Sequence, residues 1–160
     1  MVKFFEGAKT RNRQPGLPMN TSVLAPESPP TCLPLQGLLV DIDGVLRNED
    51  QVIPGAIETI EYLKKQEIPF LLATNTTRRS RYTLSNNLRR LGFKISVNHI
   101  FSAPFAGARW LKEHQVKSIF LFLGGDAYRE FTSFRITSRK PEYVVLGDVS
   151  DDLTYANLNQ

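Results

Sequence analysis

The sequence predicts an α/β fold, in which a Rossmann-like parallel sheet alternates strands with helices. Three observations support this prediction. Short continuous apolar runs recur along the chain, as in strands that are covered on both faces. Amphipathic stretches with the helical period of about 3.6 residues lie between these runs, and glycine or polar residues separate the two kinds of segment. Strand, helix, strand, helix in this order is typical of a parallel sheet with crossover helices.

The composition is that of one ordinary domain. The 160 residues are 41% apolar and 22% charged, which suffices for a core and a solvated surface. The formal net charge is +4, but the basic residues are scattered, so we expect no nucleic-acid partner. A single cysteine, Cys32, excludes a disulfide within the chain and favours a reducing, cytoplasmic setting. No apolar stretch approaches the roughly 18 to 20 residues that cross a bilayer, so we expect no membrane anchor.

Residues 1–36 are expected to form a disordered, proline-rich extension. They hold six of the ten prolines and show neither the period of a helix nor that of a strand. Such a segment buries too little apolar surface to offset the entropy of ordering. Basic residues outnumber acidic ones near its start, which leaves an organelle transit peptide as the alternative to an unstructured leader. These basic residues are Lys3, Lys9, Arg11 and Arg13.

Order is expected to begin at Gly37. The run "GLLVDI" predicts the first strand over 37–42. In the stretch that follows, Pro54 suits the first turn of a helix. The apolar side chains on one face of that helix are Ile57, Ile60 and Leu63. The run "PFLLAT" then predicts the second strand over 69–74.

The polar turn "NTTRRS" leads from the second strand into another helix, which stops at Gly92. This helix carries Leu84, Leu88 and Leu91 on one stripe. A second series of elements follows with the same alternation. Its members are a helix over about 103–114, a strand over 118–123, a short helix after Asp126, a strand over 143–147 and a helix starting near Asp152.

Two acidic residues, Asp41 and Asp43, end the first predicted strand. In open parallel sheets ligands bind at the carboxyl ends of the strands. Two adjacent carboxylates repel each other unless a cation neutralises them, and hard oxygen ligands favour Mg²⁺. We therefore expect Asp41 and Asp43 to form a metal site. The alternative is that both acids are turn and cap residues before Gly44.

The second predicted strand ends in a polar segment, Thr74-Asn75-Thr76-Thr77. Its hydroxyls, amide and backbone N–H groups precede a helix start, where a phosphate group is favoured. The alternative is an ordinary helix cap. Acids with a metal beside one strand end and phosphate donors beside the next together predict a phosphoryl-transfer site.

The acids and the polar segment also resemble a known family. The segment "DIDGV", followed 33 residues after its first Asp by "TN", is similar to motifs I and II of the haloacid-dehalogenase-like (HAD) hydrolases. Further segments resemble subfamily IIA, the nitrophenylphosphatase-like branch that carries its cap between motifs II and III and includes the phospholysine phosphohistidine inorganic pyrophosphate phosphatase group. These segments are "IPGAIETIEYLKK", "LLATNTTRRSR", "LRRLGFKIS", "HIFSAPFAGARWLKE" and "PEYVVLGDVSDDLTYANLNQ". The likeness runs from Gly37 to Gln160.

The resemblance implies a Mg²⁺-dependent phosphatase that acts through an aspartyl-phosphate on a small phosphorylated metabolite. Asp41 would be the nucleophile and would also touch Mg²⁺. Asp43 would be the general acid and base, with its backbone carbonyl on the metal. Thr74 would hold the phosphoryl oxygens with help from the Asn75 backbone, and Gly44 would permit the tight turn after the nucleophile.

The resemblance also divides the chain. Residues 37–81 would form the first part of the HAD core with motifs I and II, and residues 82–160 a connecting helix and part of an inserted α/β cap. The core would then be incomplete. The alternative function is that of a catalytically incomplete fragment or isoform with only a binding or interaction role. Because an incomplete sheet exposes an apolar edge, the chain is also a candidate for a homo-oligomer.

Members of the family also have a lysine and a later acidic pair in the active site. The segment around the last predicted strand contains residues of the same types, namely Lys140, Asp148 and Asp152. Lys140 stands immediately before that strand, without the helix that normally separates the lysine from the acids. The continuation "LTYANLNQ" resembles the helix that follows a strand inside a cap. We therefore interpret all three as cap residues. A compact phosphatase complete in 160 residues is the alternative.

Two further groups have both a functional and a structural interpretation. The glycines of "LGGDAYREF" could cradle a phosphate, but the segment lacks the P-loop lysine, so a strand-to-helix turn capped by Asp126 is favoured. The arginines Arg78, Arg79 and Arg81 could reach a substrate phosphate. A solvated helix start is the favoured interpretation of these three.

Overall fold

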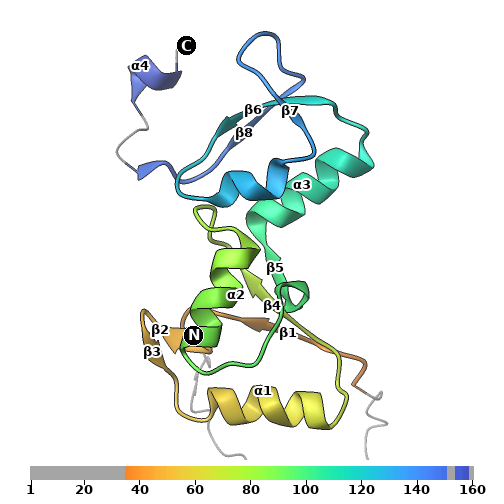
Figure 1. The fold of residues 1–160 in the computed structure, drawn as a ribbon, viewed down its shortest axis with the longest axis vertical. Coiled ribbons are helices and arrows are strands. Elements are labelled where there is room, and N and C mark those ends of the chain that lie inside the picture. Colours follow the sequence, from red (N-terminus) through yellow and green to blue (C-terminus); the bar gives the residue numbers. More distant parts are fainter. Residues whose placement is uncertain (1–34, 151–153, 159–160) are drawn as a thin grey trace, which may run out of the picture. The chain divides into compact units, whose positions relative to one another are not determined.

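The computed structural model describes residues 35–150 and 154–158. The expected N-terminal extension therefore lies outside the described residues apart from 35 and 36, and Asp152 lies outside them as well. Figure 1 shows the order of the elements. They are β1 (Leu38–Asp41), β2 (Arg47–Asn48), β3 (Gln51–Val52), α1 (Ala56–Lys65), β4 (Phe70–Thr74), α2 (Arg81–Arg90), the 3-10 helix η1 (Val97–His99), β5 (Ile100–Ser102), α3 (Ala103–Glu113), β6 (Ser118–Phe122), the 3-10 helix η2 (Ala127–Phe131), β7 (Arg135–Ile136), β8 (Tyr143–Leu146) and α4 (Tyr155–Leu158).

Strands β1, β4 and β5 form a parallel sheet in the order β1-β4-β5. Its first two strands are the two apolar runs predicted from the sequence, and the predicted α/β class is confirmed. The register pairs Asp41 of β1 with Ala73 of β4, and Thr74 of β4 with Ser102 of β5. The sequence does not reveal β5, because its three residues are too few to show a period.

Helix α1 begins at Ala56, two residues after Pro54, and lies in the stretch predicted for it. It buries Ile60 and Leu63 on the apolar face that the sequence shows. Its first turn carries an acid and its last turn two lysines, which suits the partial charges at the two ends of a helix.

Helix α2 begins after Ser80, whose hydroxyl accepts a hydrogen bond from the Thr83 N–H at 3.3 Å. This bond satisfies one of the backbone donors that a helix start leaves free. The helix buries Leu84 and Leu88, and Gly92 follows its end with a φ of 100° that favours glycine.

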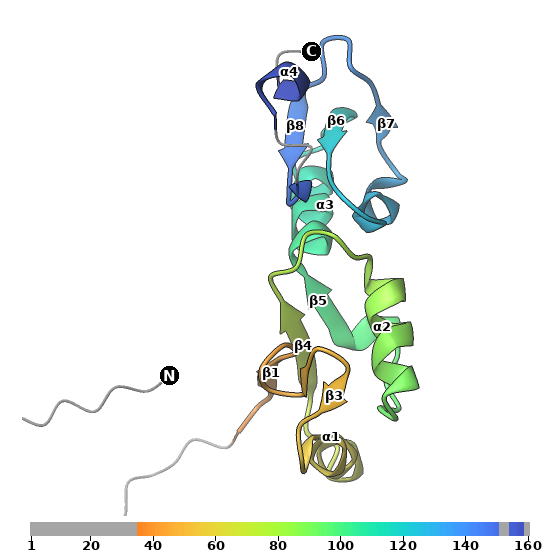
Figure 2. The same ribbon diagram turned by 90° about the vertical axis from the view of Figure 1, so that its left-hand side faces the viewer.

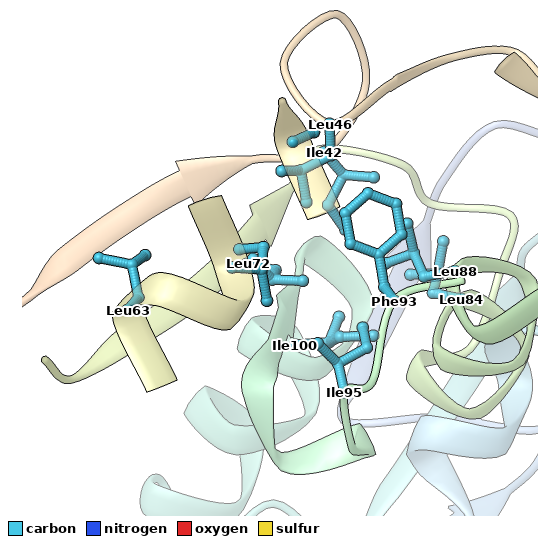
Figure 3. Packing of buried hydrophobic residues seen from close by; sticks show 11 residues of the cluster. Ile42, Leu46, Leu63, Leu72, Leu84, Leu88, Phe93, Ile95 and Ile100 are labelled. Atoms are coloured by element: carbon cyan, nitrogen blue, oxygen red, sulfur yellow. The ribbon is translucent and has the colours of Figure 1, made fainter. Parts of the chain in front are cut away.

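The first hydrophobic cluster joins side chains of β1, α1, β4, α2 and β5, and Figure 3 shows how they converge. Its buried members are Ile42, Leu46, Ala56, Ile60, Leu63, Leu72, Leu84, Leu88, Phe93, Ile95 and Ile100. The cluster thus includes α2 and the chain as far as Ile100, whereas the division made from the sequence ends the first part of the core at residue 81. Whether α2 belongs to a core or to a cap in a whole enzyme stays a prediction.

The other face of this sheet is open to solvent within the described residues. Along β1, Leu38 and Val40 pack against the first cluster, whereas Leu39 is 76% exposed. Its neighbour on β4, Leu71, is 37% exposed. The expectation of strands covered on both faces is therefore wrong for this part of the chain, because the cluster that α1 and α2 complete lies on the Leu38 face.

A second parallel sheet has the order β7-β6-β8, and Figure 2 shows it with α3 and η2. Side chains from α3, β6 and η2 form a second cluster, with the fully buried Ile119 and Phe131 among its members. The predicted helix and strands of the second series are found at the expected places. The two-residue strand β7 was not expected, and the short helix after Asp126 is a 3-10 helix. In the part of the chain that the structure describes, no helix has the length and apolar character needed to cross a bilayer.

Candidate active site

The candidate site lies at the carboxyl edge of the first sheet, where β1 and β4 end side by side. Because Asp41 pairs with Ala73, Thr74 extends one residue beyond the position of Asp41 along the neighbouring strand. The parallel register therefore brings two of the residues predicted from the sequence, Asp41 and Thr74, to the same edge of the sheet.

Asp41 is the last residue of β1 and its side chain is exposed. Its Oδ1 accepts a hydrogen bond from the Ile42 N–H at 2.8 Å. No described residue donates a hydrogen bond to its Oδ2. One carboxylate oxygen is thus fixed by the backbone, and the other is open to a ligand.

Gly44 makes the tight turn that follows Asp43. Its φ is 85°, and its N–H donates to the Arg47 carbonyl at 2.8 Å. A Cβ at this position would meet no described atom within 4 Å, so the backbone conformation and not crowding requires the glycine here. The turn is anchored by Ile42 and Leu46, which are 0% and 2% exposed. This anchoring leaves Asp43 at the surface.

Asp43 forms an ion pair with Arg47, in which Arg47 Nη2 lies 2.8 Å from Asp43 Oδ1. The Arg47 side chain is only 13% exposed, and its Nη1 also donates to the Glu49 carbonyl at 3.0 Å. Arg47 thus holds Asp43 in place while leaving that carboxylate 53% exposed. The sequence analysis missed Arg47. Its position four residues after Asp43, in the strand that returns from the turn, is the signal that could have found it.

Thr74 and its neighbours do not cap a helix. Helix α2 starts six residues after Asn75 and takes Ser80 as its cap. The interpretation of "TNTT" as an ordinary helix cap is therefore wrong, and so is the expectation that a helix start directly after this segment favours a phosphate. Thr74 is buried, and its Oγ1 accepts a hydrogen bond from the Thr76 N–H at 3.2 Å. Asn75 is exposed. The segment is therefore a loop at the strand end, in which the Thr74 hydroxyl still has a proton to donate and Asn75 is exposed.

The turn from Thr77 to Ser80 is fastened to the loops of the second sheet. Thr77 Oγ1 accepts from the Asp148 N–H at 2.8 Å, and the Arg78 carbonyl accepts from the Asp126 N–H at 3.0 Å. A Cβ on Gly125 would lie 2.1 Å from that same carbonyl oxygen. Gly125 thus permits a close backbone contact with Arg78. This agrees with the favoured interpretation of "LGGDAYREF" as a turn between a strand and a helix that holds no phosphate.

Asp126 binds the start of α2 and does not cap the 3-10 helix that follows it. Its Oδ1 accepts from the Ser80 N–H at 3.0 Å, and its Oδ2 accepts from Ser80 Oγ at 2.6 Å and Thr83 Oγ1 at 2.7 Å. No side-chain bond caps η2. The expected cap on η2 is therefore wrong, because the stronger donors lie at the start of α2. Burial by itself raises the pKa of Asp126, but the bonds from Ser80 and Thr83 and a nearby guanidinium together hold that pKa below its usual 3.8.

Arg81, the first residue of α2, contacts Glu130 and Phe105. Its backbone N–H donates to Glu130 Oε1 at 2.7 Å and its Nε to Glu130 Oε2 at 3.1 Å. Its guanidinium lies 3.4 Å from the centre of the Phe105 ring, a cation–π contact. The interpretation of a solvated helix start is therefore wrong for Arg81. Arg78 is 44% exposed, with its Nη1 3.8 Å from Asp148 Oδ1.

The donor chemistry at Asp41 and Asp43 fits a magnesium ion. Proteins commonly bind Mg²⁺ through one or two carboxylates, and water and substrate phosphates complete its six ligands. Within residues 35–150 and 154–158, no group of three or more His, Cys, Asp or Glu side chains is placed to hold a metal. Asp148 therefore does not join this pair. It follows β8, in the second sheet, and Lys140 is exposed in the turn before that strand.

Sequence comparison finds related proteins. A model of the family described as haloacid dehalogenase-like hydrolase matches residues 38–135. The haloacid dehalogenase-like hydrolase domain-containing protein 2 of Mus musculus is 33% identical over 126 residues, which cover 79% of this chain and 48% of the relative. The phospholysine phosphohistidine inorganic pyrophosphate phosphatase of Homo sapiens is 31% identical over 129 residues, which cover 78% and 47%. The chain spans about half the length of the curated relatives it matches.

Solved structures share the fold. The p-nitrophenyl phosphatase from Archaeoglobus fulgidus has a TM-score of 0.70 at 26% identity, over 78% of this chain and 49% of that one. NagD from E. coli has a TM-score of 0.71 at 23% identity, over 78% and 50%, and supports the fold alone. The resemblance stated from the sequence, including its nitrophenylphosphatase-like branch, is confirmed. Because the family match runs from the first residue of β1 to the first residue of β7, well over half of the chain, this protein belongs to the haloacid dehalogenase-like hydrolase family.

Proposed function

We propose that Asp41 and Asp43 form the reacting half of a phosphatase site that hydrolyses phosphoric monoesters through an aspartyl-phosphate. The observation that carries this proposal is the register of β1 and β4, which brings the open carboxylate of Asp41 and the threonine of motif II to one edge of the sheet. Membership of a hydrolase family supports the reaction class.

In the first step, Asp41 Oδ2 attacks the phosphorus of the monoester. A bond forms between this oxygen and phosphorus, and the bond from phosphorus to the ester oxygen breaks. Protonated Asp43 gives its proton to the departing oxygen, so the alcohol leaves neutral. The contact with Arg47 and the turn at Gly44 fix the position of Asp43, two residues after the nucleophile, for this transfer.

In the second step, Asp43, now ionised, takes a proton from water as the water oxygen attacks phosphorus. The bond between phosphorus and Asp41 breaks, which frees inorganic phosphate and restores both carboxyl groups. Thr74 donates its hydroxyl to a phosphoryl oxygen, which is possible because its Oγ1 serves only as acceptor toward Thr76. The backbone N–H of the exposed Asn75 adds a second donor, and Gly44 keeps the approach to phosphorus free of a side chain.

Magnesium is the cofactor that this site would use. Asp41 and the Asp43 backbone carbonyl would hold it, and when bound it supplies positive charge that offsets the negative charge of the phosphoryl oxygens. The substrate we propose is a small phosphorylated metabolite in the cytoplasm. The human relative's name describes it as a phosphatase for phospholysine, phosphohistidine and inorganic pyrophosphate.

Hydrolysis of nitrophenyl phosphate tests the proposal. The wild-type protein is assayed with Mg²⁺ and with EDTA, beside Asp41→Asn and the control Glu58→Gln, which replaces an exposed acid in the first turn of α1. We expect turnover that needs Mg²⁺, falls at least a thousandfold in Asp41→Asn as roughly expected for loss of a nucleophile, and survives in Glu58→Gln. Turnover that is indifferent to both EDTA and Asp41→Asn would contradict the proposal.

A second candidate is a binding role without turnover. The observation that favours it is that no third acidic or histidine side chain joins Asp41 and Asp43 within the described residues. This candidate predicts binding of Mg²⁺ or phosphate, measured by calorimetry, that depends on Asp41 in a protein without hydrolytic activity. Turnover by the purified chain would exclude it.

A further inference from the structure

A second cluster of functional groups lies beside the candidate site, in a cleft between the β2–β3 hairpin and α2. Figures 1 and 2 both show the hairpin next to this helix. The cleft has a volume of about 400 Å³. Its lining is Arg47, Asp50, Arg79, Asn87, Arg90 and Leu91. The chemistry proposed above uses this cleft only through Arg47, which holds Asp43.

The lining is rich in guanidinium groups from three separate segments. Arg47 belongs to β2, Arg79 to the turn before α2 and Arg90 to the last turn of α2. Among the residues that the structure describes, Arg79 and Arg90 form no ion pair, and neither does Asp50, the one carboxylate of the lining. Apart from Arg47, which pairs with Asp43, the cleft therefore carries two guanidinium groups and one carboxylate, none of them in an ion pair with a described residue.

Arg47 supplies an independent observation. Its Nε is buried and has no hydrogen-bond partner among the described residues. A buried donor without a partner is unfavourable, and such groups normally point to a ligand or an ordered water. The Nη atoms of the same side chain are already used by Asp43 and Glu49. The Arg47 side chain lines the same cleft as the unpaired Arg79 and Arg90.

The helix end alone does not account for this arrangement. A cation in the last turn of α2 is favoured by the helix dipole, which explains Arg89 and Arg90. It does not explain why Arg79, near the start of the same helix, and Arg47, from another element, line the cleft with Arg90. Arg89 lines a different cavity, which makes it a natural control.

We propose that this cleft binds a phosphate group other than the one that reacts at Asp41. Guanidinium groups match the oxygens of a phosphate with paired N–H donors, and Asn87 adds an amide donor. The Arg47 side chain both lines the cleft and forms the ion pair with Asp43. The phosphate belongs either to the same substrate molecule, which is then a bisphosphorylated compound, or to free inorganic phosphate. The first source rests on the proposed function.

The test compares two ligands that differ by one phosphate, ethylene glycol bisphosphate and ethyl phosphate. Their affinities are measured by calorimetry in the Asp41→Asn background, so that no turnover interferes, and inorganic phosphate is titrated in parallel. We expect the bisphosphate to bind more tightly, and Arg79→Gln and Arg90→Gln each to weaken it by roughly tenfold or more, as for the loss of one charge-assisted hydrogen bond. Arg89→Gln should leave the affinity unchanged. Ethyl phosphate should be insensitive to all three substitutions.

The outcomes of these titrations either identify the source of the phosphate or overturn the inference. Arginine-dependent binding of the bisphosphate assigns the phosphate to the substrate, whereas arginine-dependent binding of inorganic phosphate without a preference for the bisphosphate assigns it to the free ion. Binding of both ligands that Arg79→Gln and Arg90→Gln leave unchanged overturns the inference. Equal losses in Arg89→Gln also overturn it, because they would show only the effect of net charge. Absence of turnover in the wild type would refute the proposed function without touching these titrations.

Discussion

Replacing Asp126 by alanine should loosen the turn that follows motif II. The carboxylate accepts hydrogen bonds from the Ser80 N–H, Ser80 Oγ and Thr83 Oγ1 at 2.6 to 3.0 Å. Asp126→Ala removes the acceptor of all of them, although the Ser80 hydroxyl still accepts from the Thr83 N–H. The start of α2 therefore keeps its own cap and loses the contact that fastens it to the second sheet.

The magnitude follows from the kind of bond that is lost. A hydrogen bond to a charged group contributes about 1.5 to 3 kcal/mol. Because the Asp126 side chain is still 26% exposed, water replaces part of what is lost. We expect a net decrease of about 2 kcal/mol in the free energy of unfolding, or roughly 4 to 8 °C in Tm for a chain of this length.

Urea unfolding followed by circular dichroism measures this decrease. The control is Glu113→Ala, which removes an exposed ion pair with Arg109 and should cost about 0.5 kcal/mol or less. A cycle that combines Asp126→Ala with Thr83→Val isolates the bond between the two side chains. Equal effects of Asp126→Ala and Glu113→Ala, or zero coupling in the cycle, would refute the role that we assign to Asp126.

The pH dependence gives the same reasoning a second test. The pKa of Asp126 is lowered in the folded protein, so its contribution is fully present above its unfolded value of about 3.8 and is lost as the pH falls through the folded value. The difference in unfolding free energy between wild type and Asp126→Ala should thus be constant from pH 7 to about pH 5 and shrink below pH 4. A difference that grows on acidification has the wrong sign.

The remaining predictions concern packing. Gly125→Ala should cost more than about 2 kcal/mol, because its φ is 64° and its Cβ would lie 2.1 Å from the Arg78 carbonyl oxygen; Gly55→Ala, at φ 84° in open space, should cost only about 1 kcal/mol in the same urea experiment. Leu72→Ala should cost about 2 to 5 kcal/mol because that side chain is 0% exposed, whereas Leu39→Ala, at 76% exposed, should cost less than about 1 kcal/mol. If the open face of the first sheet drives self-association, light scattering should show a mass that rises with concentration and that Leu39→Lys lowers; a monomer at all concentrations in the wild type would contradict this.

The sequence predicts the main elements because their signals are local. The apolar runs of β1 and β4 and the helical stripes of α1 and α2 each lie within one segment, so the order of strand and helix follows from reading along the chain. The pairing of Asp41 with the end of β4 also follows, since consecutive strands of a parallel sheet end at one edge.

The contacts between distant segments do not follow from the sequence. Asp126 binds Ser80 at the start of α2, 46 residues earlier in the chain, and nothing in "LGGDAYREF" distinguishes that from a cap on its own short helix. The exposed face of β1 is missed for the same reason: an apolar run shows which side chains can be buried, and the described fold buries only alternate ones. Arg47 is missed because the sequence does not show that it pairs with Asp43. That ion pair is recognised only once the turn between the two residues is known.

Trapping the phosphoryl group on the protein tests the central claim most directly. The wild type, Asp41→Asn and Asp43→Asn are mixed with nitrophenyl phosphate and Mg²⁺, quenched in acid and analysed by mass spectrometry of their peptides. We predict a phosphoryl group on Asp41 that accumulates in Asp43→Asn and is absent from Asp41→Asn. In Asp43→Asn the first step still proceeds, because nitrophenolate is a weakly basic leaving group that needs no acid, whereas the second step has lost its base. A labelled residue other than Asp41, or turnover in the wild type with no label on Asp41 in any variant, would contradict the account.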